Sequence, residues 1–166
     1  MSRGFVKEGY QEETPIIPPR SALPTAAINY VTPLGMELLQ GEREHLENEC
    51  ETLTTINEQQ RRIDLTVLNG KLDLLNERIA SARILDPATQ PSDEVRFGAT
   101  VTYKISSSPN PQSFQIVGVD EADVAKRKIA FVAPIAIALT GHKVADEVPF
   151  QLAGNTKKLK IVSIAY

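Results

Sequence analysis

The sequence has 166 residues, a formal net charge of −3 and a single cysteine, Cys50. This charge balance excludes a strongly basic nucleic-acid-binding domain, and a lone cysteine excludes an internal disulfide or a cysteine metal cluster. No apolar run is long enough to cross a bilayer, and the N-terminus lacks the apolar core of a signal peptide. We therefore expect a cytoplasmic protein with no membrane partner.

Residues 1–31 are rich in proline and show little hydrophobic periodicity. The pair Pro18-Pro19 favours an extended polyproline conformation and excludes a helix. We predict a flexible N-terminal tail over this range. Two roles stay open, because the tail is either an inert extension or a segment that folds onto a partner. The candidate anchors for the second role are Phe5, Tyr10, Ile16 and Ile17.

The segment 32–86 predicts helices. Thr32-Pro33 is a typical helix start, because Thr caps a helix well and Pro is favoured at its first position. Two stripes of mostly apolar residues follow, each with the alternating spacing of a heptad repeat. The first stripe holds Met36, Leu39, Arg43, Leu46, Cys50 and Leu53, and the second holds Leu65, Leu68, Leu72, Leu75, Ile79 and Ala82.

The two stripes are out of phase, so one continuous helix would place Asn57 and Gln60 on its apolar face. Two antiparallel helices joined near residue 57 avoid this, with Thr55 and Glu58 as a capping box. Each arm has about 24 residues, which gives a finger roughly 35 Å long. Asn69-Gly70 is a stronger turn signal by composition, but a turn there would leave very unequal arms. A dimeric coiled coil of one long helix is the alternative.

Residues 93–166 predict a small β-rich domain. The expected strands are residues 96–103, 114–119, 128–132, 148–152 and 159–166. The segment 134–139 starts with Pro and is followed by Gly141, which favours a short helix. Pro149 cannot donate to a neighbouring strand, so we expect its strand at a sheet edge. The predicted fold class is therefore α+β, with a helical hairpin followed by a sheet and one short helix.

Four segments resemble, in order and spacing, the GreA/GreB family of transcription elongation factors. They are residues 31–35 (VTPLG), 97–101 (FGATV), 116–123 (IVGVDEAD) and 133–144 (APIAIALTGHKV). The resemblance covers residues 31–166. It implies an antiparallel coiled-coil hairpin over residues 32–86 and an FKBP-like C-terminal domain over residues 93–166.

The resemblance also implies that the protein binds RNA polymerase. The C-terminal domain would dock at the rim of the secondary channel, and the coiled coil would reach into the channel. The docking candidates in the matched segments are Asp120, Glu121, Asp123, Pro134, Ile135 and Lys143. Nucleic acid would then be met only through the polymerase. We expect a monomer that regulates transcription elongation as a binding protein rather than as an enzyme.

In that family, an acidic motif at the hairpin tip helps to hold the second catalytic Mg²⁺ of the polymerase, which then hydrolyses its own transcript. This sequence lacks the motif, and the acids nearest the expected tip are Glu51 and Glu58. We therefore expect no metal or cofactor of its own, beyond an indirect contact with the polymerase Mg²⁺, and no efficient stimulation of transcript cleavage. The alternatives are a true cleavage factor that uses these two glutamates, and a homodimeric coiled-coil adaptor that does not bind polymerase.

Overall fold

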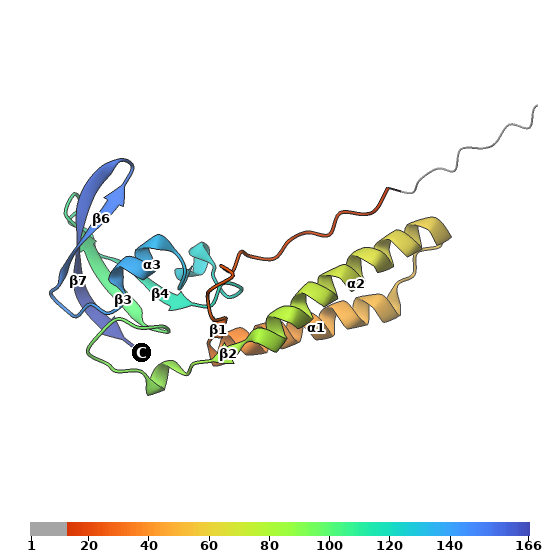
Figure 1. The fold of residues 1–166 in the computed structure, drawn as a ribbon, viewed down its shortest axis with the longest axis horizontal. Helices are drawn as coiled ribbons and strands as arrows, with labels where there is room; N and C mark the ends of the chain where they lie inside the picture. The colour runs from red at the N-terminus through yellow and green to blue at the C-terminus, as the bar shows by residue number, and fades with distance from the viewer. Residues whose placement is uncertain (1–12) are drawn as a thin grey trace, which may run out of the picture.

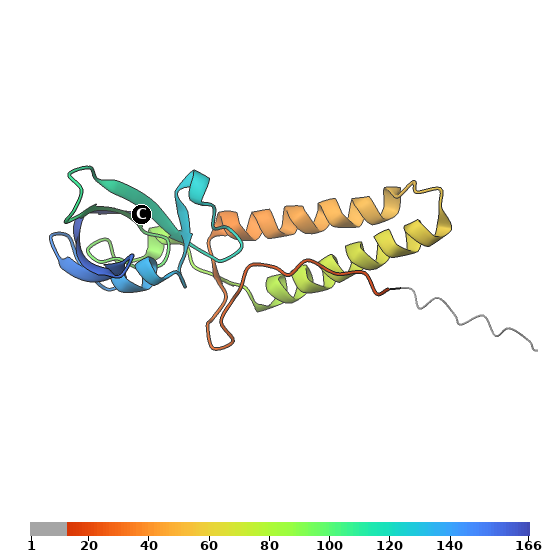
Figure 2. The same ribbon diagram turned by 90° about the horizontal axis from the view of Figure 1, so that it is seen from above.

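Two long helices project from a curved sheet in the computed structural model, which describes residues 13–166 (Figure 1). The helices are α1 (Pro33–Thr52) and α2 (Glu58–Ser81), and they lie side by side in opposite directions (Figure 2). This mixture of helices and sheet confirms the α+β class. It also excludes the single continuous helix, because residues 53–57 form a turn between the two.

The apolar stripes predicted from the sequence form the core of this helical pair, by which we mean α1 and α2 together. Leu39 and Leu46 of α1 and Leu68 and Leu75 of α2 are its buried members within the helices. Leu75 is fully buried. Burying such a side chain contributes about 1.5–3 kcal/mol, so these leucines alone stabilise the pairing substantially.

Side-chain caps fix where both helices begin. Thr32 Oγ1 accepts a hydrogen bond from the Gly35 amide at 2.9 Å, and Asn57 Oδ1 accepts one from the Gln60 amide at 3.0 Å. The capping box predicted for Thr55 and Glu58 is wrong. The Thr55 hydroxyl instead donates to Asp64 Oδ2 at 3.0 Å, because Asn57 stands directly before α2 and caps it.

The C-terminal half holds a five-stranded sheet in the order β5-β4-β3-β7-β6. Its strands are β3 (Thr100–Ile105), β4 (Gln112–Val117), β5 (Lys128–Ala130), β6 (Glu147–Leu152) and β7 (Asn155–Ala165). Neighbouring strands are antiparallel except β4 and β5, which are parallel. The edge position of β6 confirms the prediction from Pro149. We call residues 93–166 the sheet region.

The short helix predicted at residues 134–139 is confirmed as α3 (Pro134–Leu139). Ala136 and Leu139 are fully buried against the sheet, in a core that also holds Val101, Ile116, Leu159 and Ile161. The first strand begins later than predicted. Residues 96–99 form a turn in which the Ala99 amide donates to the Arg96 carbonyl, and Gly98 adopts a positive φ of 88° that a strand does not contain.

A second, two-stranded sheet closes the base of the helical pair. β1 (Tyr30–Val31) and β2 (Arg83–Ile84) pair in parallel, so the chain entering α1 is tied to the chain leaving α2. Two short 3-10 turns complete the described elements, η1 (Pro87–Thr89) and η2 (Val124–Lys126). None of the helices within residues 13–166 is long and apolar enough to cross a membrane.

Part of the predicted N-terminal tail lies against the rest of the molecule. From Ile17 onward it makes defined contacts with α2, α1 and the sheet region, through Ile17 and Arg20. Proline excludes a helix but not order, because these contacts come from segments far away in the sequence. Of the candidate anchors, Ile16 is 89% exposed, and Phe5 and Tyr10 lie outside the described residues.

Candidate functional site

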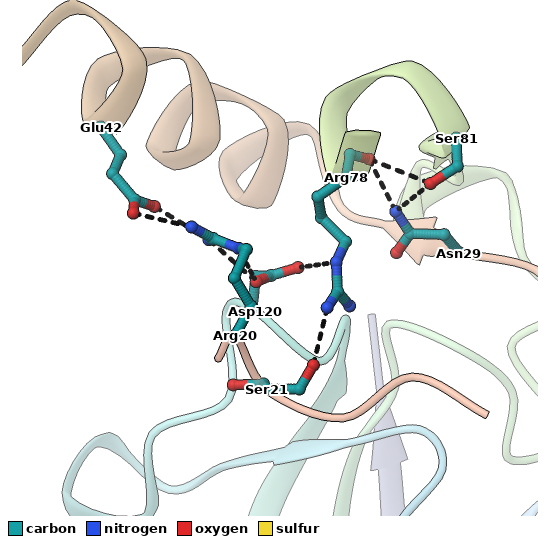
Figure 3. A network of polar contacts seen from close by, with 7 residues as sticks. All are labelled: Arg20, Ser21, Asn29, Glu42, Arg78, Ser81 and Asp120. Atoms are coloured by element: carbon teal, nitrogen blue, oxygen red, sulfur yellow. Dashed lines mark hydrogen bonds and ion pairs between the residues drawn. The ribbon is translucent and has the colours of Figure 1, made fainter. Parts of the chain in front are cut away.

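A buried carboxylate joins the sheet region to both helices. Asp120 lies beyond β4, and only 8% of its side chain is exposed. Its Oδ1 accepts a hydrogen bond from Arg20 Nε at 3.0 Å, and its Oδ2 lies 3.4 Å from Arg78 Nε of α2 (Figure 3). Burying a lone carboxylate is strongly unfavourable, so the two arginines offset the cost of placing Asp120 at this junction.

Arg20 contacts α1 with the other side of its guanidinium group. Its two terminal nitrogens donate to the two oxygens of Glu42, at 2.8 and 2.9 Å. The hydrogen bond lowers the pKa of Glu42 and raises the pKa of Arg20. A bidentate pair fixes geometry as well as charge, so Arg20 couples α1 to Asp120 in a defined position.

The last turn of α2 is held by the N-terminal segment at two points. Arg78 Nη2 donates to the carbonyl oxygen of Ser21 at 2.7 Å. Asn29 Nδ2 donates to the carbonyl oxygen of Arg78 at 2.9 Å and to Ser81 Oγ at 3.2 Å (Figure 3). Asn29 is itself buried, and its amide satisfies groups at the end of α2 that have no partner within the helix.

The neighbouring carboxylate, Glu121, ties the sheet region to the start of α1. Its Oε2 accepts a hydrogen bond from the Thr32 hydroxyl at 2.5 Å, and its Oε1 accepts one from Lys128 Nζ at 2.9 Å. Its side chain is 3% exposed. A side chain at Gly35 would place its Cβ 2.8 Å from Glu121 Oε2, so only glycine leaves room for the carboxylate there.

The backbone just before these two acids also approaches the chain that enters α1. A Cβ at Gly118 would lie 2.6 Å from the carbonyl oxygen of Tyr30, which explains the absence of a side chain at that position. Gly118, Asp120 and Glu121 all belong to the segment 116–123 that the sequence analysis singled out. This segment is therefore the junction between the sheet region and the helical pair.

Two of the predicted docking residues face the interior of the molecule. Asp120 and Glu121 point inward and bind Arg20, Arg78, Thr32 and Lys128, so they present no free carboxylate to a partner. The sequence could not reveal this, because acids in a loop are usually solvated and their partners here lie far away in the chain.

The other docking candidates do not take part in the contacts of Asp120 and Glu121. Asp123 caps η2 by accepting from the Ala125 amide, and Ile135 packs partly against the sheet core. Pro134 is exposed at the start of α3. Lys143 is exposed and donates to Asp93 at 2.9 Å, which raises the pKa of Lys143 and lowers that of Asp93.

The tip of the helical pair carries an apolar residue rather than a carboxylate. Ile56 is 99% exposed in the turn between α1 and α2. Glu51 and Glu58 lie exposed on either side of that turn. Asp64 accepts hydrogen bonds from Thr55 and from Gln60 Nε2, so both of its oxygens have partners within the tip.

Sequence reasoning missed the network of charged side chains around Asp120. Glu42 and Arg78 read as surface charges of a helix, and Arg20 reads as part of an irregular tail. One signal was available, because Arg20 is the only basic residue between Lys7 and Arg43.

Within residues 13–166, no three His, Cys, Asp or Glu side chains gather where they could hold a metal ion.

Comparison with known proteins places the sheet region in a family. Residues 90–166 match the family described as "Transcription elongation factor, GreA/GreB, C-term". The chain is 36% identical over 99 residues to the transcription elongation factor GreA of Pelobacter propionicus, and 33% identical over 99 residues to that of Hyphomonas neptunium. Each alignment covers 60% of this chain and 63% of the relative, so the chain spans less than two thirds of these relatives' length.

The chain is also similar to proteins of known structure. The chain is 20% identical to the GreA factor homolog 1 (Gfh1) protein of Thermus thermophilus, with a TM-score of 0.40, over 84% of this chain and 100% of that one. It is 24% identical to an elongation factor GreA/GreB from Nitrosomonas europaea, with a TM-score of 0.41, over 84% of this chain and 99% of that one.

Proposed function

Because the chain belongs to the GreA/GreB family of transcription elongation factors through its C-terminal domain, residues 90–166, we propose that it binds RNA polymerase and regulates transcription elongation. The observation that carries the proposal is the family match itself. It is supported by relatives named as transcription elongation factors at about 35% identity. We place this activity in the cytoplasm.

We propose further that the helical pair acts as a coiled-coil finger in the secondary channel and that the sheet region is its FKBP-like base. The length of the finger favours this role, since an α2 of 24 residues extends about 36 Å at 1.5 Å per residue. The chain acts as a monomeric binding protein, without catalysis or a cofactor of its own, and meets nucleic acid only through the polymerase.

The face of the sheet region around α3 is the proposed docking surface. It offers Pro134, Ile135 and Lys143 from the predicted set, with Asp123 on η2 as the remaining candidate. Lys143 gives the sharpest test, because its partner Asp93 is also exposed and the pair contributes little to folding. Lys143→Glu should weaken binding to core polymerase several-fold, whereas Lys104→Glu, at an exposed position of β3, should not.

The chemistry of the tip argues against efficient stimulation of transcript cleavage. Hard Mg²⁺ prefers carboxylate oxygens, whereas the turn itself presents Ile56, and Asp64 is held within the tip by hydrogen bonds from Thr55 and Gln60. We therefore propose modulation of pausing or of access to the channel. The runner-up is a cleavage factor that uses Glu51 and Glu58, which flank the turn and are exposed.

One experiment separates these functions. Core polymerase is captured with the tagged full-length chain, with and without a known channel-binding factor as competitor, and a backtracked complex is then scored for transcript cleavage. We expect capture, competition and no rapid cleavage. Rapid cleavage that is lost in the Glu51→Gln/Glu58→Gln variant, and kept in Glu44→Gln/Glu47→Gln, would establish the cleavage factor. Failure of capture together with a dimeric mass by light scattering would establish the adaptor instead.

A further inference from the structure

An extended segment lies across the junction of the three parts of the molecule. Residues 17–23 border an open groove of about 710 Å³ along α2, and their contacts reach α1, α2 and the sheet region. We propose that residues 17–23, here called the strap, fix the orientation of the helical pair on the sheet region, and that release of the strap allows the two to reorient.

The polar anchor of the strap is Arg20. Its side chain binds both α1, through Glu42, and the sheet region, through Asp120. Arg78 connects α2 to both of the other parts. It pairs with Asp120 of the sheet region and donates a hydrogen bond to the carbonyl oxygen of Ser21 in the strap. Asp120 thus receives one arginine from the strap and one from α2, so loss of the strap leaves only part of this tie.

The apolar anchor is Ile17, which packs where Gly70 has no side chain. A Cβ at Gly70 would lie 2.1 Å from Ile17 Cδ1 and 2.7 Å from its Cγ1. Glycine in the middle of a helix weakens it, so its presence in α2 requires a reason. Close approach of the strap supplies one, and the same position offers a way to displace the strap without touching its charges.

Release of the strap leaves both cores intact. No strap residue belongs to the apolar core of the helical pair or to that of the sheet. The remaining ties lie at the base of the helices, in the β1–β2 pairing, in the bond between Thr32 and Glu121, and in the pair of Arg78 with Asp120. These hold the chain together at one end of the pair, where a change of angle is still possible, whereas the strap acts further along α1 and α2.

Gly70→Ala is the central test variant, and Gly41→Ala is its matched control. Both replace a glycine within a helix, but a Cβ at Gly41 meets no atom within 4 Å. Trypsin cleavage after Arg20 reports on release of the strap, because the Arg20 side chain binds Glu42 and Asp120 while the strap is in place. We expect cleavage about tenfold faster or more in Gly70→Ala, and no change in Gly41→Ala, because cleavage follows the open population.

Distances between spin labels then report on orientation. Labels at Glu58→Cys on the tip and Val162→Cys on β7, in a Cys50→Ala background, give a distance distribution for the full chain without polymerase. We expect one narrow distribution for the parent and for Gly41→Ala, and a broader or shifted one for Gly70→Ala and Arg20→Gln. Unchanged cleavage in Gly70→Ala, or faster cleavage with an unchanged distribution, would overturn the proposal. Neither readout involves polymerase, so a failure of the proposed function and a failure of the strap proposal can be told apart.

Discussion

The Thr32 hydroxyl serves Glu121 and the first helix at the same time. It accepts a hydrogen bond from the Gly35 amide at 2.9 Å and donates one to Glu121 Oε2 at 2.5 Å. The cap of α1 and a buried carboxylate of the sheet region therefore depend on one oxygen atom. A single substitution at Thr32 acts on local helix stability and on the junction together.

Thr32→Val removes this hydroxyl while keeping the branched shape of the side chain. We expect the free energy of unfolding to fall by about 2–3 kcal/mol, because a helix cap is lost and a buried carboxylate loses a donor. Urea denaturation followed by circular dichroism measures the change. Thr32→Ser, which keeps the hydroxyl, should stay within about 1 kcal/mol of the parent. Equal losses in the two variants would show that the hydroxyl is not the stabilising group.

The glycines of α1 make a second, internally controlled prediction. At Gly35 a new Cβ would lie 2.8 Å from Glu121 Oε2, whereas at Gly41 it would meet nothing within 4 Å. Gly41→Ala should stabilise the protein by about 0.5–1 kcal/mol through helix propensity alone. Gly35→Ala should destabilise it despite the same propensity gain. Thermal unfolding of the two variants side by side gives the test, and stabilisation in both would contradict the packing at Glu121.

The helices could be predicted from the sequence because their determinants are local. Thr32-Pro33 marks the start of α1, and the leucines at heptad spacing lie in the core between α1 and α2. The turn at Gly70, favoured by composition, does not form. Its glycine serves a contact with Ile17, more than fifty residues earlier in the chain, which no local pattern contains.

The junction could not be predicted for the same reason. Arg20 and Asp120 are separated by 100 positions, and each looks like a solvated charge in its own surroundings. Family resemblance identified the segment that holds Asp120 and Glu121, but it suggested contact with a partner. In the structure the two side chains are 8% and 3% exposed and are bound within the chain.

Acid should weaken the contact between the strap and α1. The hydrogen bond from Arg20 lowers the pKa of Glu42 below its ordinary value of 4.5, and the charge of Lys71 on α2 acts in the same direction. A lowered pKa means that the stabilisation is complete above pH 4.5 and is lost as the pH falls through the lowered value. Because Glu42 is 43% exposed, the contribution is about 1 kcal/mol or less.

The comparison of the parent with Glu42→Gln isolates this effect from other carboxylates, Asp120 included, because both proteins retain them. The difference in free energy of unfolding between the two should be constant near neutral pH and should shrink below pH 4.5. A difference that persists undiminished to strongly acidic pH would mean that the charge of Glu42 is not what binds Arg20.

Ile56 allows a test of the tip that is separate from folding. Since its side chain is 99% exposed, Ile56→Ser should change the free energy of unfolding by no more than about 0.5 kcal/mol. If the tip enters the polymerase channel as proposed, the side chain becomes buried there. Its loss should weaken binding by about tenfold, which corresponds to the partial burial of one Ile side chain.

The measurement is competition for core polymerase between labelled parent protein and each unlabelled variant. Ile56→Val retains an apolar side chain at the tip and should compete nearly as well as the parent. Equal competition by Ile56→Ser and the parent would mean that the tip does not touch the polymerase. Docking would then rest on the sheet region alone, where Lys143→Glu tests it.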